Sequence, residues 1–271
     1  MNWRYRVLTA AALASLGFVL LPIIFVVWLA FFAQEIAVFP PRGYSLRWFT
    51  AVFEHRQFVS GFITSLQVGV AATIIGLCLG IPAALALARR HDRVAKGLNQ
   101  LLLLPIVAPG VVLGTAFYIF QVEAEIMAYG QGYNLAVIGS AGGLIAAHVL
   151  IVIPWTVRLV LASLEGFDQS TREAALNLGA TPWIAFRRVT LPMIRPGIVA
   201  AALFGFVMSF GNLEMSLFLV GPGRTTLPIA ILQYLEWKLD PTIAAVSVYQ
   251  MLLIGSALLL TNHFVKLARV V

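Results

Sequence analysis

Six long apolar runs, separated by short polar segments, constrain the fold of this chain more than any other feature of its sequence. They cover approximately residues 7–33, 58–88, 101–122, 136–161, 197–220 and 242–265. Each run is long enough to cross a bilayer, whose hydrocarbon core needs about 20 apolar residues in a helix. Because a chain in lipid must satisfy its own backbone hydrogen bonds, the runs predict an all-α, polytopic membrane protein with six transmembrane helices.

Composition and charge agree with this class. Charged residues make up only 11% of the chain, against about 25% in soluble domains. The net charge is +7, but thirteen of the eighteen Lys and Arg residues lie in segments that share one side of the membrane. Such a bias sets orientation, with the basic side in the cytoplasm. We therefore predict cytoplasmic termini and a lipid bilayer, not nucleic acid, as the surroundings.

The runs divide the chain into three parts. Residues 1–57 form the first transmembrane helix and an outer loop, residues 58–265 form a core of five helices with a cytoplasmic loop at 162–196, and residues 266–271 form a cytoplasmic tail. In the outer loop, residues 45–53 have the pattern of a short amphipathic helix, with Trp48 at the membrane interface.

The sequence contains no recognisable catalytic, metal-binding or nucleotide-binding motif. Its one cysteine, Cys78, lies in an apolar run, which leaves no disulfide framework and no cysteine pair for a metal. It has neither a G-x-x-x-x-G-K-[ST] loop for ATP phosphates nor an H-E-x-x-H motif. We therefore expect no catalytic residues, no metal and no cofactor in this chain.

The cytoplasmic loop has the sequence signals of a small folded element. Ser170 and Glu173 have the spacing of a capping box at a helix start, and Gly179 is placed to end that helix. Thr181 and Pro182 then suit the N-cap and first position of a second helix. The loop therefore predicts two short helices joined at a glycine.

The first of these helices has a face of small residues. Ala174, Ala175 and Leu178 lie on one side of it, since residues three and four apart are neighbours on a helix. A face of this kind on the cytoplasmic side suits close docking of another protein.

Glu214 is the most informative residue within the apolar runs. An acidic group facing lipid costs about 3 kcal/mol, so we expect Glu214 to face the bundle interior or a polar path. Asn212, Ser209 and Ser216 lie close enough along the helix to share that environment. Glu214 either lines a path for a polar or cationic solute or pins one helix to another. His148, deep in the fourth run, either hydrogen-bonds across helices or takes part in transport.

Glycine pairs spaced four apart indicate close helix crossings or ordinary packing. The pairs are Gly76 and Gly80, Gly110 and Gly114, and Gly139 and Gly143. Prolines also interrupt the runs, and Pro109 follows Pro105 after three residues.

The cytoplasmic loop carries a known family pattern, E-A-A-x3-G-x9-I-x-L-P. Here it reads Glu173-Ala174-Ala175, Gly179, Val189 in place of isoleucine, and Leu191-Pro192. The chain thus resembles permease subunits of binding-protein-dependent ABC importers of the type I fold. The segments Thr64-Ser65-Leu66 and Leu104-Pro105 extend this resemblance to the second and third spans. The segments Thr190-Leu191-Pro192-x3-Pro196-Gly197-Ile198 and Thr226-Leu227-Pro228 are most similar to the spermidine/putrescine branch.

The resemblance implies a function and a set of partners. The loop would couple to the ATPase through Glu173, Ala174, Ala175 and Gly179, with Leu178 on the same face. The partners would be a second permease, two copies of a cytoplasmic ATPase that bind ATP and Mg²⁺, and a periplasmic substrate-binding protein. The chain would be a transport subunit of a bacterial inner membrane and not an enzyme.

The resemblance favours a polyamine or related amine as the solute. Polyamine permeases often have acidic residues directly after Ser-Phe in the fifth span, whereas here Ser209-Phe210 is followed by Gly211-Asn212 and the acid is Glu214. Related branches carry opines, amino-acid derivatives, aminoethylphosphonate-like compounds and thiamine precursors. The alternative function is an ion-coupled secondary transporter that uses Glu214 and works without an ATPase.

Overall fold

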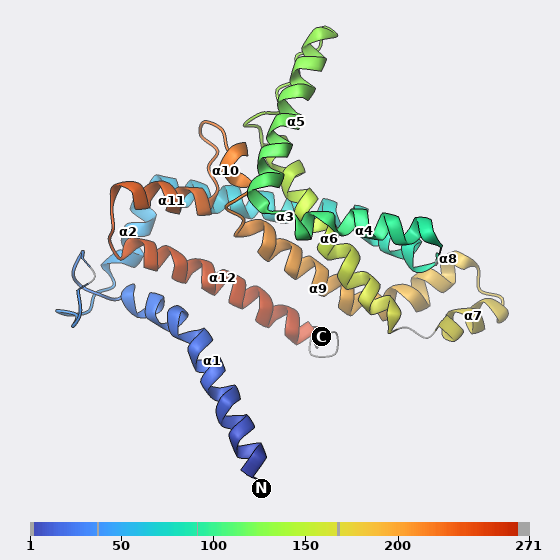
Figure 1. The fold of residues 1–271 in the computed structure, drawn as a ribbon, viewed down its shortest axis with the longest axis horizontal. Coiled ribbons are helices and arrows are strands. Elements are labelled where there is room, and N and C mark those ends of the chain that lie inside the picture. Colours follow the sequence, from blue (N-terminus) through green and yellow to red (C-terminus); the bar gives the residue numbers. More distant parts are fainter. Residues whose placement is uncertain (1–2, 37, 91, 167–168, 265–271) are drawn as a thin grey trace. The chain divides into compact units, whose positions relative to one another are not determined.

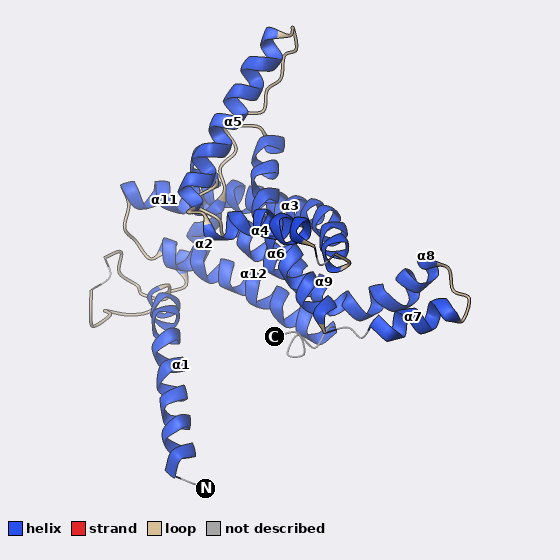
Figure 2. Cartoon of the chain, turned by 45° about the vertical axis from the view of Figure 1, so that its right-hand side comes forward, coloured by secondary structure: helices blue, strands red, loops and turns tan. Residues whose placement is uncertain are grey.

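The computed structural model describes residues 3–36, 38–90, 92–166 and 169–264, where every regular element is a helix (Figure 1). In chain order these are α1 (Trp3–Leu29), α2 (Arg47–Glu54), α3 (Arg56–Ala88), α4 (Arg93–Val107), α5 (Gly110–Gly130), α6 (Ala141–Glu165), α7 (Gln169–Asn177), α8 (Pro182–Ala185), the π-helix η1 (Phe186–Thr190), α9 (Leu191–Phe210), α10 (Ser216–Leu219), α11 (Leu227–Trp237) and α12 (Thr242–Phe264). The predicted all-α class is confirmed (Figure 2).

Six helical spans in the described residues are long and apolar enough to cross a membrane. They are Tyr5–Leu29, Arg56–Ala88, Gly110–Gly130, Ala141–Glu165, Pro182–Phe210 and Thr242–Thr261. The predicted number of spans is confirmed, although the bounds of the third and fifth spans differ from those expected.

The third span begins later than the sequence indicated. Residues 101–107 belong to α4, which is a separate helix, and α5 then runs to Gly130. The break falls at Ala108, which is extended, with φ −71° and ψ 139°. Pro109 explains the break, because a proline disfavours helical geometry in the residue before it. Hydropathy alone did not reveal this boundary.

The fifth span begins and ends earlier than expected. It runs from Pro182 to Phe210, not over residues 197–220. The chain then leaves the helix at Gly211, and only the single turn of α10 follows. Glu214 therefore lies in an irregular segment, and its expected place inside the fifth transmembrane helix is wrong.

The chain forms two compact units, the first made of Met1–Val59 and Ala230–Gly255 and the second of Ser60–Ile229 and Ser256–Val271. In the first unit, the predicted amphipathic helix of the outer loop is present as α2. Trp48 is buried, however, and its Nε1 donates to the carbonyl of Phe32 over 2.6 Å. The ring therefore packs inside the unit.

A buried carboxylate stabilises the turn between α11 and α12 in the same unit. Asp240 accepts hydrogen bonds from the Tyr234 hydroxyl and the Thr242 backbone N–H, both at 2.9 Å, and pairs with Lys238 at 2.9 Å. Burial by itself raises the pKa of the Asp240 carboxyl. The bonds from Thr242, Lys238 and Tyr234 outweigh burial and hold this pKa below its ordinary value.

In the second unit, α6 packs against α3, α4 and α9 through very close contacts. Val152 of α6 is fully buried between Gly76 of α3 and Gly205 of α9, and a Cβ added at Gly205 would lie 2.7 Å from the Val152 Cγ1 atom. Gly80 meets Thr156 in the same way. The pair Gly76 and Gly80 is thus a close helix crossing, as small residues permit.

The other two glycine pairs have different neighbours. Gly110 and Gly114 face residues 214–218. Gly139 and Gly143 lie in the turn before α6 and its first residues, against the backbones of Gly221 and Val137. At these two pairs, the absence of a side chain lets a segment outside the spanning helices pack closely against the backbone.

Candidate functional site

The loop between α6 and α9 folds into a helical elbow made of α7, α8 and η1. Beyond Asn177, Gly179 turns the chain with a φ of +88°. The Ala180 N–H donates to the Ala175 carbonyl and the Gly179 N–H to the Leu176 carbonyl, both over 3.0 Å. These bonds form a Schellman motif, which closes a helix through a left-handed residue. The prediction that Gly179 ends the first helix is confirmed.

The second arm of the elbow also starts as predicted. The Thr181 hydroxyl accepts a hydrogen bond from the Ile184 N–H over 3.3 Å, and Pro182 takes the first helical position. The helix then continues through the wide turn of η1, where the Leu191 N–H donates to the Phe186 carbonyl. The elbow is therefore joined to α9 without a break.

One detail of the predicted cap differs in the structure. Within the described residues α7 begins at Gln169, so Ser170 lies inside the helix and is not its N-cap. The expected capping box between Ser170 and Glu173 is therefore not formed. The residue directly before α7 is outside the described residues.

The surface of the elbow is exposed and partly apolar. Glu173, Ala174, Leu178 and Gly179 are exposed, and Ala175 is half-buried. Leu178 is 89% exposed and Trp183 is 66% exposed. Figure 2 shows α7 and α8 projecting to the right of the other helices of their unit. Large apolar side chains gathered on such a projection are typical of a protein contact.

The break after α9 is the second candidate site. Gly211 ends the helix, and the Asn212 side-chain oxygen accepts a hydrogen bond from the Met215 N–H over 2.8 Å. An asparagine that caps an amide three residues on is typical of a new helix start, and α10 follows here. The segment 211–215 is therefore held in an ordered turn.

Three of the predicted pathway residues come together around His148 of α6. His148 Nδ1 lies 2.8 Å from the Ser209 Oγ, and Nε2 lies 3.2 Å from the Ser216 Oγ. The Ser216 hydroxyl donates to the Asn212 carbonyl over 2.9 Å. Because the Ser216 hydroxyl already donates to Asn212, its oxygen accepts from His148 Nε2–H.

This network is buried and links three elements. His148 is 1% exposed, Ser209 2% and Ser216 0%, so α6, α9 and α10 are joined where the fifth span breaks. Sequence reasoning gave His148 no preference for either role. The available signal was that a buried histidine must find hydrogen-bond partners, and two serines lay within reach of the same region.

Glu214 does not share this network. It is exposed on the surface of the chain, and its carboxylate lies against the backbone of Gly110, where a Cβ would collide with it. The Glu214 carbonyl approaches Gly114 in the same way. The Glu214 side chain therefore lies apart from those of Ser209 and Ser216, and the common pathway role of Glu214, Asn212, Ser209 and Ser216 stays a prediction.

Among the described residues, no three His, Cys, Asp or Glu side chains lie close enough to hold a metal ion.

The comparisons with known proteins fit this architecture. Residues 76–270 match the family described as binding-protein-dependent transport system inner membrane component. The chain is 31% identical to the molybdenum transport system permease protein ModB of Mycobacterium tuberculosis, over 91% of this chain and 89% of that one. It is 30% identical to the putrescine transport system permease protein PotI of Escherichia coli, over 76% of this chain and 72% of that one.

A solved structure shows the same fold. A bacterial ABC transporter involved in the import of the acidic polysaccharide alginate contains a chain that matches with a TM-score of 0.74 and 18% identity, covering 97% of this chain and 96% of that one. The family match and the relatives together confirm the resemblance seen in the cytoplasmic loop. This chain belongs to the inner membrane components of binding-protein-dependent transport systems and is a permease subunit of an ABC importer.

Proposed function

We propose that this permease pairs with a second permease around a central path, and that its elbow docks onto a cytoplasmic ATPase. One copy of the ATPase would bind each permease, and the two ATPases would supply the sites for ATP and Mg²⁺. The elbow is the observation that carries the proposal, because it is ordered by its own caps while Leu178 and Trp183 stay exposed. An ordered apolar projection favours a protein partner over water.

The orientation follows from the same docking. If the elbow binds a cytoplasmic ATPase, the six spans place both termini in the cytoplasm as well, which agrees with the basic residues on that side. The segments that carry α2 and α11 then face the periplasm. There a substrate-binding protein would deliver the solute.

Glu214 supports a second permease and a polar path. It lies at the end of a membrane span and is exposed on the isolated chain. An acid that faced lipid there would cost about 3 kcal/mol. A partner subunit or a water-filled path beside Glu214 removes that cost.

The same residue favours an amine-bearing solute, with a polyamine as the first candidate. ModB and PotI are named for molybdenum and putrescine, so the relatives differ in the charge of what they carry. A carboxylate on the path attracts a cation and repels an oxyanion. Glu214 therefore supports an amine without an anionic group, such as a polyamine, over an oxyanion.

Affinity purification of the chain from its native membrane tests the assembly. We expect a P-loop ATPase and a second permease to copurify and to be identified by mass spectrometry. Recovery of the chain alone, active in uptake driven by a proton gradient, would overturn the importer assembly and favour a secondary transporter.

Uptake by the Glu214→Gln variant tests the solute. We expect wild-type uptake of labelled putrescine to be inhibited by unlabelled amines and not by molybdate. Glu214→Gln should reduce that uptake at least tenfold with the ATPase still bound. Glu54→Gln, which changes another exposed acid, is the control and should have no effect. Uptake of molybdate that is unaffected by Glu214→Gln would reject the amine.

A further inference from the structure

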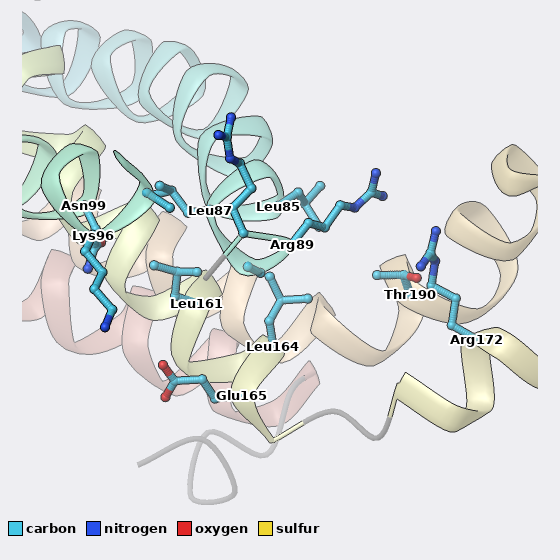
Figure 3. Close-up of a pocket in the computed structure, with 13 residues that line it drawn as sticks. Leu85, Leu87, Arg89, Lys96, Asn99, Leu161, Leu164, Glu165, Arg172 and Thr190 are labelled. Carbon is cyan, nitrogen blue, oxygen red and sulfur yellow. The ribbon is translucent and has the colours of Figure 1, made fainter. Parts of the chain in front are cut away.

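A pocket beside the elbow shares only Arg172 and Thr190 with it. Its volume is about 490 Å³. The ends of α3 and α6, the first turns of α4, and single residues of α7 and η1 line it. Figure 3 shows Lys96 and Asn99 on one side, Arg172 and Thr190 on the other, and Leu161 and Leu164 between them. The pocket thus lies where two membrane spans end and the elbow begins.

Basic side chains outnumber acidic ones in the lining of this pocket. Arg89, Arg90, Lys96 and Arg172 are basic, and Glu165 is the one carboxylate among the lining residues. Asp92 pairs with Arg90 over 2.6 Å and also caps α4. No hydrogen bond or ion pair within the described residues engages the other three basic groups. The pocket therefore carries positive charge that the chain does not compensate.

Two polar side chains in the pocket lack partners as well. Thr190 is 6% exposed, and its hydroxyl makes no hydrogen bond within the part of the chain that the structure describes. The buried side-chain oxygen of Asn99 is also unpaired, and its amide can rotate to offer N–H groups instead. Buried polar groups nearly always have a partner. These two groups therefore point to a ligand independently of the charge.

The apolar part of the lining indicates that the ligand can be a membrane lipid. Leu85, Leu161 and Leu164 are partly buried and form a floor at the end of the spanning helices. Basic pockets between membrane helices on the cytoplasmic side bind anionic lipid headgroups. A phosphate group satisfies the basic and hydroxyl donors, whether it belongs to such a lipid or is free in solution.

We propose that this pocket binds a phosphate-bearing anion between Lys96 and Arg172, with Thr190 as a further donor. The proposal is independent of the transported solute. Arg172 directly precedes Glu173 of the elbow, and Lys96 belongs to α4. A bound phosphate would therefore join the first arm of the elbow to the membrane helices.

Native mass spectrometry of the purified complex, stripped of lipid, tests the site. The probes are phosphatidylglycerol, the zwitterionic phosphatidylcholine, and inorganic phosphate as a competitor. We expect phosphatidylglycerol to bind at least tenfold more tightly than phosphatidylcholine. Lys96→Gln and Arg172→Gln should each weaken it about tenfold, as loss of a charge-assisted bond does. Thr190→Val should weaken it less.

Matched variants separate binding from folding and from general charge. Arg93→Gln removes one charge from α4 outside the pocket and should bind like wild type, and Arg172→Lys should restore binding. Competition by millimolar phosphate would identify a free anion as the ligand, and its absence a lipid. Equal binding of both lipids, or equal loss in Arg93→Gln and Lys96→Gln, would overturn the site.

Discussion

Replacing Gly179 with alanine should weaken the elbow through its backbone alone. A Cβ at Gly179 would meet no atom within 4 Å, so the substitution creates no collision. The φ of +88° is the obstacle, because an L-residue in the left-handed region costs about 1–2 kcal/mol. A cost of that size lowers the population of the closed elbow about 5- to 30-fold.

The assay is solute uptake per ATP hydrolysed in proteoliposomes that contain the whole complex. We expect Gly179→Ala to lower this ratio and Gly179→Val to lower it further, since a β-branched side chain tolerates the left-handed region poorly. Gly179→Asn should be mildest, because asparagine also enters that region. Copurification of the ATPase should persist in the alanine variant.

Gly97 provides the matched control. It lies inside α4 with no atom within 4 Å of an added Cβ, so Gly97→Ala should leave transport unchanged and stabilise the helix by up to about 1 kcal/mol. Wild-type coupling in Gly179→Val, or a larger defect in Gly179→Asn than in Gly179→Ala, would show that the left-handed turn is not what the elbow requires.

Two further predictions concern stability, measured as melting temperature in detergent. Gly205→Ala should destabilise the chain because the added methyl lies 2.7 Å from Val152 Cγ1, and overpacking costs about 1–3 kcal/mol. In the double variant Gly205→Ala with Val152→Ala, the nearest contact relaxes to the 3.7 Å that separates the new Cβ from Val152 Cβ. Losses of stability that simply add in the double variant would therefore disprove the contact. Because the pKa of Asp240 is lowered in the folded chain, its contribution to stability is present above about pH 4, the pKa of an aspartate in the unfolded chain, and is lost as the pH falls through the folded-state pKa. The melting temperature should therefore drop on acidification, and Asp240→Asn should reduce that drop. An identical dependence of melting temperature on acidic pH in the variant would refute the role of Asp240.

Much of the fold follows from local sequence rules, and the differences have physical causes. The six spans depend on apolar length, and the elbow depends on caps that each involve neighbouring residues, such as Gly179 and Thr181. The third span begins later than predicted because Pro109 restricts the backbone of Ala108, and a hydropathy average does not detect this effect. The predicted roles of the coupling residues stay predictions.

The second site was harder to predict because it depends on tertiary contacts. Asn212 caps Met215 and so turns Glu214 out of the helix, although the local sequence is apolar enough to continue it. His148 meets Ser209 and Ser216 across 61 and 68 residues of sequence. No pattern within one run encodes such a separation.

The helix that starts in the elbow is continuous up to Gly211. The two candidate sites therefore lie at its opposite ends and would move like the ends of a lever. The 29 residues of this helix span about 43 Å at 1.5 Å per residue. A tilt of about 10° pivoted at one end would move the other end by about 7 Å, more than one helical turn. A small rotation of the elbow would therefore displace Gly211, Asn212 and Glu214 at the far end of this helix by several ångströms.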